Sequence, residues 1–316
     1  MHYLGELISI GVAVSWTMSA LFFEYAGKKI GSLIVNLLRL VFAFFLLGAM
    51  LMILTGSPFP QHADTNAWIW MVLSGLIGFV FGDLCLFHSY LLITARFSQL
   101  LMTLAPPFAA LFAWIILGEK LTFMAFLGMS VTLTGIAISI MKRGNSDTLD
   151  KGANSVRFKL NMPLKGFLLG VGGALGQGLG IVLSKQGMNY YEISASGSSV
   201  AGYIPFAATQ IRIITGMIGF TLIILLSGRT RNLMEGIKNR KGMSATFAGS
   251  IFGPFIGVSL SLMAVQYTNA AIASTIMATT PIIILLPYVL IYKKKITVVE
   301  LLGAVLSVGG VALFFL

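Results

Sequence analysis

The feature that most constrains this chain is a series of apolar runs, each about 20 residues long and separated by short polar turns. A bilayer core about 30 Å thick needs roughly 20 consecutive apolar residues for one helix to cross it. The runs therefore predict an all-α membrane protein with ten transmembrane helices. The predicted spans are Leu4–Tyr25, Ser32–Leu54, Ala67–Tyr90, Thr94–Ile116, Leu121–Met141, Leu164–Met188, Ile204–Ser227, Ala245–Tyr267, Ala270–Tyr292 and Ile296–Leu316.

Composition supports this fold class. Hydrophobic residues make up 57% of the 316 residues and charged residues only 10%, whereas a soluble domain carries about a quarter charged residues. Residues 142–163 form the longest loop, which is polar and reads as a cytoplasmic linker. Cys85 is the only cysteine, so no internal disulfide can form.

The basic residues are distributed unevenly between the two sides of the predicted membrane. Most Lys and Arg residues lie in the loops after spans one, three, five, seven and nine. The opposite loops hold only Lys120, with Lys185 near a span end. Cytoplasmic loops are enriched in Lys and Arg, so both termini are predicted outside. This distribution explains the net charge of +11 by membrane insertion, without a nucleic-acid partner.

The two halves of the chain repeat each other at a constant offset of 175 residues. The matched pairs at this offset are Gly78 with Gly253, Gly82 with Gly257, Met102 with Met277, Pro106 with Pro281, Thr122 with Thr297, Gly128 with Gly303 and Gly135 with Gly310. Shared helix composition would give one or two such matches, but seven at one offset indicate a repeat.

The repeat predicts residues 1–141 as a first unit of five spans and residues 164–316 as a second. Because five is odd, the second unit must enter the bilayer upside down. Inverted repeats of this kind are a transporter architecture, with the substrate site near the midplane between the halves.

The sequence resembles the EamA-type ten-helix members of the drug/metabolite transporter superfamily. The resemblance rests on Trp16, on Asn36-Leu37-Leu38-Arg39-Leu40, on Ser74-Gly75-Leu76-Ile77-Gly78, on Ala105-Pro106, and on Gly118-Glu119-Lys120-Leu121-Thr122 with Gly128 and Gly135. It implies export or exchange of small metabolites such as amino acids, in the inner membrane of a bacterium. The second half departs from the pattern at Lys293-Lys294-Lys295 and at Gln177, so the resemblance does not assign a substrate.

Two charged residues lie inside spans at similar depth. Arg39 and Asp83 are each seven residues from the cytoplasmic end of their span, roughly 10 Å deep at 1.5 Å per residue. We expect them to form an ion pair or to compete for a substrate carboxylate. The alternative for Arg39 is that its long side chain extends to the headgroups.

Arg212 is the repeat counterpart of Arg39, but the position that matches Asp83 is Val258. An intramembrane arginine without a built-in acid could bind an anionic substrate group through two hydrogen bonds. Alternatively, it extends to the outer headgroups or bonds backbone carbonyls near Pro254.

Four further candidates are less specific. Trp16 and Gln177 are repeat counterparts near the middle of spans one and six, where they could line a cavity or simply pack. Glu24 lies at the end of span one, as a solvated helix end or as a proton carrier if buried. His88 is expected to be an interfacial or packing residue.

The prolines Pro106, Pro107 and Pro281 interrupt spans four and nine, where they could act as hinges for alternating access or as static kinks. The favoured function is a secondary transporter of a small polar metabolite, with proton exchange through Asp83 or Glu24 as one coupling option.

An uncoupled, channel-like facilitator is the main alternative function. A lipid-modifying enzyme is remote, because the three His residues and the scattered acids form no catalytic or metal-binding pattern. The expected partners are a small-molecule substrate and the lipid bilayer, with no cofactor or metal, in a monomer or homodimer.

Overall fold

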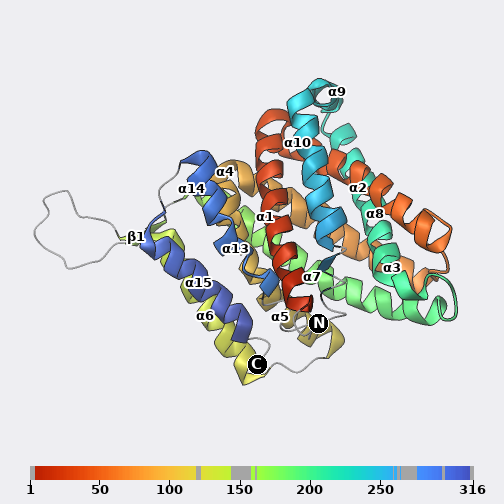
Figure 1. The fold of residues 1–316 in the computed structure, drawn as a ribbon, viewed down its shortest axis with the longest axis horizontal. Helices are drawn as coiled ribbons and strands as arrows, with labels where there is room; N and C mark the ends of the chain where they lie inside the picture. Colours follow the sequence, from red (N-terminus) through yellow and green to blue (C-terminus); the bar gives the residue numbers. More distant parts are fainter. Residues whose placement is uncertain are drawn as a thin grey trace, which may run out of the picture.

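The structure, a computed structural model, describes residues 4–118, 122–143, 158–160, 162–258, 260–261, 264, 276–293 and 296–313. Within these residues the chain is helical apart from one short pair of strands (Figure 1). Several predicted features lie wholly or partly outside the described residues. They are the turn at 119–121, most of the linker, the later part of span eight, residues 270–275 at the start of span nine, Lys294 and Lys295, and residues 314–316 at the end of span ten.

The elements follow the two predicted repeats. The first contains α1 (Leu4–Ile30), α2 (Ser32–Thr55), α3 (Thr65–Ser74), η1 (Gly75–Gly82), α4 (Asp83–Leu101), η2 (Met102–Leu104), α5 (Ala105–Leu117) and α6 (Phe123–Ile140). Strands β1 (Met141–Arg143) and β2 (Phe158–Leu160) then pair antiparallel. The second repeat contains α7 (Leu164–Ser194), η3 (Ala201–Tyr203), α8 (Ile204–Leu226), α9 (Thr230–Lys238), α10 (Arg240–Ser250), η4 (Ile251–Gly257), α13 (Thr280–Ile283), α14 (Leu285–Tyr292) and α15 (Val298–Leu313).

Within the described ranges, 6 helical stretches are long and apolar enough to cross a membrane. They are Leu4–Ile30, Ser32–Thr55, Thr65–Leu117, Phe123–Ile140, Leu164–Ser194 and Ala201–Leu226, and shorter apolar helices cover Thr280–Leu290 and Val298–Leu313. All of them coincide with predicted spans. The helical membrane fold is thereby confirmed, while the count of ten spans stays a prediction.

The stretch Thr65–Leu117 contains two spans. Its 53 residues would reach about 80 Å as one straight helix, more than twice the bilayer core. Thr94 interrupts it with φ 70° and ψ 159°. The hydroxyls of Ser89 and Ser98 then lie 2.7 Å apart, and Gln99 donates to the Tyr90 hydroxyl at 2.9 Å. Residues nine apart cannot touch along a straight helix, so the chain turns back at Thr94.

Proline breaks the helices of spans four and nine where the sequence predicts. The 3₁₀ turn η2 precedes α5, whose first turn contains Pro106 and Pro107. Pro281 lies in the first turn of the short helix α13, which ends just before α14 begins. Because proline has no N–H donor, the helix restarts at these positions. A hinge role for the three prolines is not tested by these breaks.

Each repeat has a π-helical turn at the same place in its third span. In η1 the N–H of Asp83 bonds the carbonyl of Gly78, and in η4 the N–H of Val258 bonds that of Gly253. Both pairs obey the offset of the sequence repeat. Single π-helical turns inside α-helices are rare and frequently occur at functional sites.

Helices α6 and α15 show how the repeats are related. Thr132 and Ser307 are equivalent residues, 175 apart, and each hydroxyl donates to the other's carbonyl oxygen at 3.3 and 3.5 Å. Gly135 packs against Ser307 and Gly303, while Gly310 packs against Thr132. As residue numbers rise along α6, the numbers of the contacted residues in α15 fall. These equivalent helices therefore pack antiparallel, as an inverted repeat requires.

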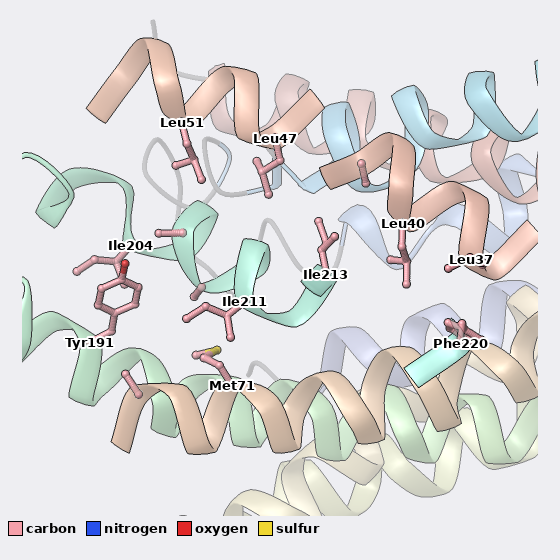
Figure 2. Close-up of a cluster of buried hydrophobic side chains, with 14 of the residues drawn as sticks. Leu37, Leu40, Leu47, Leu51, Met71, Tyr191, Ile204, Ile211, Ile213 and Phe220 are labelled. Atoms are coloured by element: carbon pink, nitrogen blue, oxygen red, sulfur yellow. The ribbon is translucent and has the colours of Figure 1, made fainter. Parts of the chain in front are cut away.

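The repeats also interlock elsewhere. Helix α1 packs on α10 and η4 of the second repeat, and α7 packs on α3, η1 and α4 of the first. A large apolar core fills the space between α2, α3, α7 and α8 (Figure 2). Its fully buried members include Leu40, Leu51, Met71, Tyr191 and Ile211. The two repeats are therefore packed into each other, and polar side chains of both meet at the interface between them.

Candidate functional site

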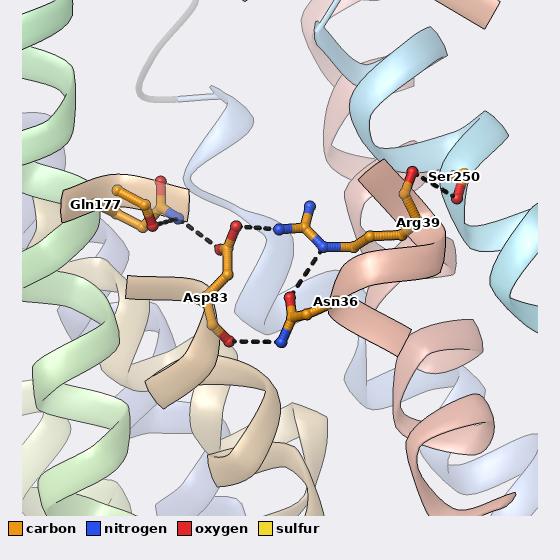
Figure 3. Close-up of polar contacts among 6 residues, drawn as sticks. Asn36, Arg39, Asp83, Gln177 and Ser250 are labelled. Carbon is orange, nitrogen blue, oxygen red and sulfur yellow. Dashed lines mark hydrogen bonds and ion pairs between the residues drawn. The ribbon is translucent and has the colours of Figure 1, made fainter. Parts of the chain in front are cut away.

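A buried ion pair connects α2 and α4 (Figure 3). Arg39 donates from Nη2 to Oδ2 of Asp83, and the two residues are only 5% and 4% exposed. Asn36 joins both: its Oδ1 accepts from Arg39 Nε at 3.1 Å, and its Nδ2 donates to the backbone carbonyl of Asp83 at 3.2 Å. The predicted ion pair is therefore present, and Arg39 does not extend to the headgroups.

The local backbone explains how Asp83 reaches this position. Asp83 directly follows the π-helical turn η1, whose altered hydrogen bonding rotates the residues after it relative to a regular α-helix. On the other side, Asn36 and Arg39 are three residues apart on one face of α2. The Ser250 hydroxyl of α10 donates to the Arg39 carbonyl at 3.3 Å.

Gln177 brings the second repeat to this ion pair. From α7, its Nε2 donates to Asp83 Oδ1 at 2.7 Å and approaches the carbonyl of Gly78 at 3.3 Å. Both carboxylate oxygens of Asp83 are thus engaged, one by Arg39 and one by Gln177. The contact requires α7 to approach closely, since a Cβ on Gly82 would lie 3.3 Å from the Gln177 backbone nitrogen.

Arg212 reaches the same region from α8. Its guanidinium carbon lies 4.4 Å from the centre of the Phe79 ring, and that of Arg39 lies 5.7 Å from the same ring. Cation–π contacts of this kind partly offset the cost of removing a guanidinium from water. The Nη2 of Arg212 lies beside Gly78, where an added Cβ would be 2.9 Å away, and Gln177 approaches the carbonyl of the same residue. The Nε of Arg212 is buried and has no hydrogen-bond partner within the described residues.

Trp16 lies elsewhere. It packs against η4, where a Cβ on Gly257 would lie 2.6 Å from the indole nitrogen, and against a small apolar cluster containing Val12 and Met277. Its repeat counterpart Gln177 lies next to the equivalent glycine, Gly82, but meets it with its backbone rather than its side chain. The two residues are thus structural counterparts, but only Gln177 contacts the ion pair.

Glu24 is fully buried at 0% exposure, and the expectation of a solvated helix end is wrong. Its carboxylate accepts from the Tyr288 hydroxyl of α14, from the Lys28 ammonium, and from the backbone N–H of Ala95 at 2.9 Å. Ala95 begins the helix after the turn at Thr94, so Glu24 caps a helix N-terminus from a neighbouring span.

The comparisons with known proteins place the chain in a family. The EamA-like transporter family matches residues 3–141 and 164–316. The chain belongs to this family. This EamA-like protein is accordingly a multi-pass membrane protein of a transporter family in the drug/metabolite transporter superfamily.

A comparison with solved structures shows that the fold is shared with a known structure. A solved structure titled "Crystal structure of protein" is similar over 99% of this EamA-like chain and 96% of its own, with a TM-score of 0.59 and 15% identity. None of the curated proteins matches the sequence.

Several residues of the EamA-like site were missed by sequence reasoning. Asn36 could have been found, because it lies one helical turn from Arg39. Phe79 and Tyr288 could not, since nothing marks one phenylalanine or tyrosine among many. Arg96 bridges to Glu300 of α15 at 3.5 Å, which adds a further polar contact between the repeats, and its guanidinium also lies near the Tyr288 ring.

Proposed function

We propose that this protein is a secondary transporter that exports or exchanges a small polar metabolite, such as an amino acid, by alternating access around a site between its two repeats. It acts in the inner membrane as ten spans, with both termini outside, as a monomer or homodimer. Residues 142–163 connect the two repeats on the cytoplasmic side.

The observation that carries this proposal is the buried polar cluster that both repeats build. Arg39 and Asp83 come from the first repeat, while Gln177 and Arg212 come from the second. Burying charged groups in a bilayer is costly, and such groups usually mark a substrate or ion pathway. A site at the repeat interface suits a carrier, because rocking one repeat against the other exposes it to each side in turn.

The proposed roles follow from the contacts. Arg39, Asp83, Gln177 and Arg212 bind the polar groups of the substrate. Trp16, which lies apart from them against η4 and the apolar cluster with Val12, lines an apolar part of the substrate's path. The helix breaks at Pro106, Pro107 and Pro281 supply hinges for the opening movement.

Proton coupling would use one of the two buried carboxylates. Asp83 and Glu24 are both held by cationic or hydroxyl partners, and a proton could replace those partners during the cycle. An uncoupled facilitator is the alternative, with Asp83 acting only as the structural partner of Arg39.

The test uses purified protein in liposomes that contain a pH-sensitive dye. Amino acids, nucleosides, organic cations and sugar phosphates are added in turn, with Asp83→Asn as the variant and the exposed Glu192→Gln as the matched control. We expect one class to evoke a proton flux that Asp83→Asn abolishes and Glu192→Gln preserves. Saturable flux of a labelled compound without proton movement would establish the facilitator, and no saturable flux of any class would contradict the proposed function.

A further inference from the structure

The charges of the central cluster do not balance. Among the described residues it contains the guanidiniums of Arg39 and Arg212 and the single carboxylate of Asp83. This leaves one positive charge in excess, in a region where Asp83 and Arg39 are almost completely buried. An uncompensated charge in such surroundings is strongly unfavourable.

The two arginines are not equally satisfied. Arg39 has the Asp83 carboxylate and the Asn36 amide as hydrogen-bond acceptors. Arg212 has the Phe79 ring at 4.4 Å, but its buried Nε lacks an acceptor within the described part of the chain. The excess positive charge is therefore located at Arg212.

Asp83 does not supply the missing acceptor, since no hydrogen bond joins it to the Arg212 Nε within the described residues. Its Oδ2 is bonded by Arg39 and its Oδ1 by Gln177. The equivalent position in the second repeat, Val258, carries no charge at all. Within the described residues the cluster consequently has a buried donor without an acceptor, and its one carboxylate already pairs with Arg39.

We infer that Arg212 binds a carboxylate of the transported molecule, which supplies the acid that the second repeat lacks. The inference rests on the proposed function and narrows its substrate class to monoanionic carboxylates and zwitterionic amino acids. A planar carboxylate accepts two parallel hydrogen bonds from a guanidinium. One carboxylate against Arg212 neutralises the cluster, with the ammonium group of an amino acid held outside it, whereas a phosphate monoester with nearly two charges at pH 7 would reverse the sign of the cluster's charge. Purely cationic amines find no free carboxylate here.

The experiment compares matched compounds on the full-length protein. For alanine, leucine and phenylalanine, each amino acid is compared with its amide, with the amine left after decarboxylation, and with the carboxylic acid that lacks the amino group. Binding is measured as the compound-induced rise in Tm of the purified protein, and flux is measured separately in liposomes. Arg212→Gln and Arg212→Lys are the variants, and Arg229→Gln, on the exposed loop before α9, is the control.

We expect at least one carboxylate-bearing compound to bind, and its amide to bind at least about tenfold more weakly, since a charge-assisted hydrogen-bond pair is lost. Arg212→Gln should remove this preference, Arg212→Lys should retain part of it, and Arg229→Gln should leave it intact. The comparison of compounds on the wild-type protein does not depend on whether the variants fold.

Equal binding of amide and carboxylate, or no binding by any carboxylate, overturns the inference. Transport of an amine or sugar in that case leaves the carrier function standing and removes only the carboxylate site. Binding of a carboxylate without flux has the opposite meaning: the site is correct and the carrier function is wrong.

Discussion

At the scale of single residues, Arg39 and Asp83 can both be charged in the protein interior because they form an ion pair. Each side chain compensates the other at about 5% exposure, and Asn36 holds both. Removing one partner of a buried pair leaves the other charge unpaired, which costs more than the pair itself contributes.

We therefore predict that Asp83→Asn lowers the free energy of unfolding by about 3 kcal/mol, measured as the loss of Tm of the purified protein. The matched control is Glu235→Gln, which breaks the exposed Arg231–Glu235 pair on α9 and should change Tm little. The double swap Arg39→Asp with Asp83→Arg should recover part of the loss. If Asp83→Asn is as harmless as the control, the pair is not a structural requirement.

The sequence predicted this pair because both residues lie at the same depth in adjacent spans. The expectation that Glu24 is solvated was wrong. It rested on the position of Glu24 near the end of the predicted span one. The burial of Glu24 comes instead from Tyr288, which is distant in sequence, and from the turn at Thr94. Contacts of this kind depend on tertiary packing and leave no local pattern.

At the scale of helices, α7 can lie against η1 only because glycines face each other. A Cβ on Gly176 would lie 2.6 Å from the Cα of Gly82, a backbone atom that cannot move aside. A Cβ on Gly172, on the same helix, would meet nothing closer than the Cys85 sulfur at 3.4 Å. Small residues at such crossings allow close helix packing in membranes.

We predict that Gly176→Ala separates α7 from η1, breaks the Gln177–Asp83 hydrogen bond and sharply reduces the yield of folded protein. Gly172→Ala should behave like the wild type. Size-exclusion profiles and Tm of the two variants give the comparison, and similar behaviour of both would show that the approach of α7 is not tight.

Glu24 acts on a different helix, the segment that begins at Ala95. We predict that Glu24→Ala lowers the free energy of unfolding by about 2 kcal/mol, since a cap and the acceptor of the Tyr288 hydroxyl are both lost. Glu24→Gln should lose less, because its amide oxygen still accepts from Ala95. A Tm that falls from the wild type to Glu24→Gln and again to Glu24→Ala supports Glu24 as the helix cap. Equal Tm values for all three proteins contradict it.

The two π-helical turns were not predicted. Their glycines were visible as a repeated spacing, which indicated close packing, but the shift of hydrogen-bond register in η1 and η4 is a property of the backbone in its packed setting. The proline breaks were predictable because a missing N–H is a local, chemical feature.

At the scale of the whole molecule, an odd number of spans per repeat predicted an inverted pair, and the antiparallel contacts of α6 and α15 agree with it. The interlocked packing of α1 with η4 and of α7 with η1 was not predictable, because matching residues reveal equivalence but not contact.

The orientation of the molecule is tested by cysteine labelling in a Cys85→Ala background. We predict that a membrane-impermeant maleimide labels Asn66→Cys, in the exposed first turn of α3, on intact cells. It should label Arg231→Cys, on the basic helix α9, only after the cells are permeabilised. The reverse pattern would mean that the termini are inside.

A carrier site between the repeats can be tested by counterflow in liposomes, with the compound that the panel identifies. We expect saturable uptake that is accelerated by unlabelled compound inside, is lost in Asp83→Asn, and is unchanged in Glu192→Gln. Uptake that does not saturate, is not accelerated from the opposite side, or survives in Asp83→Asn would contradict it.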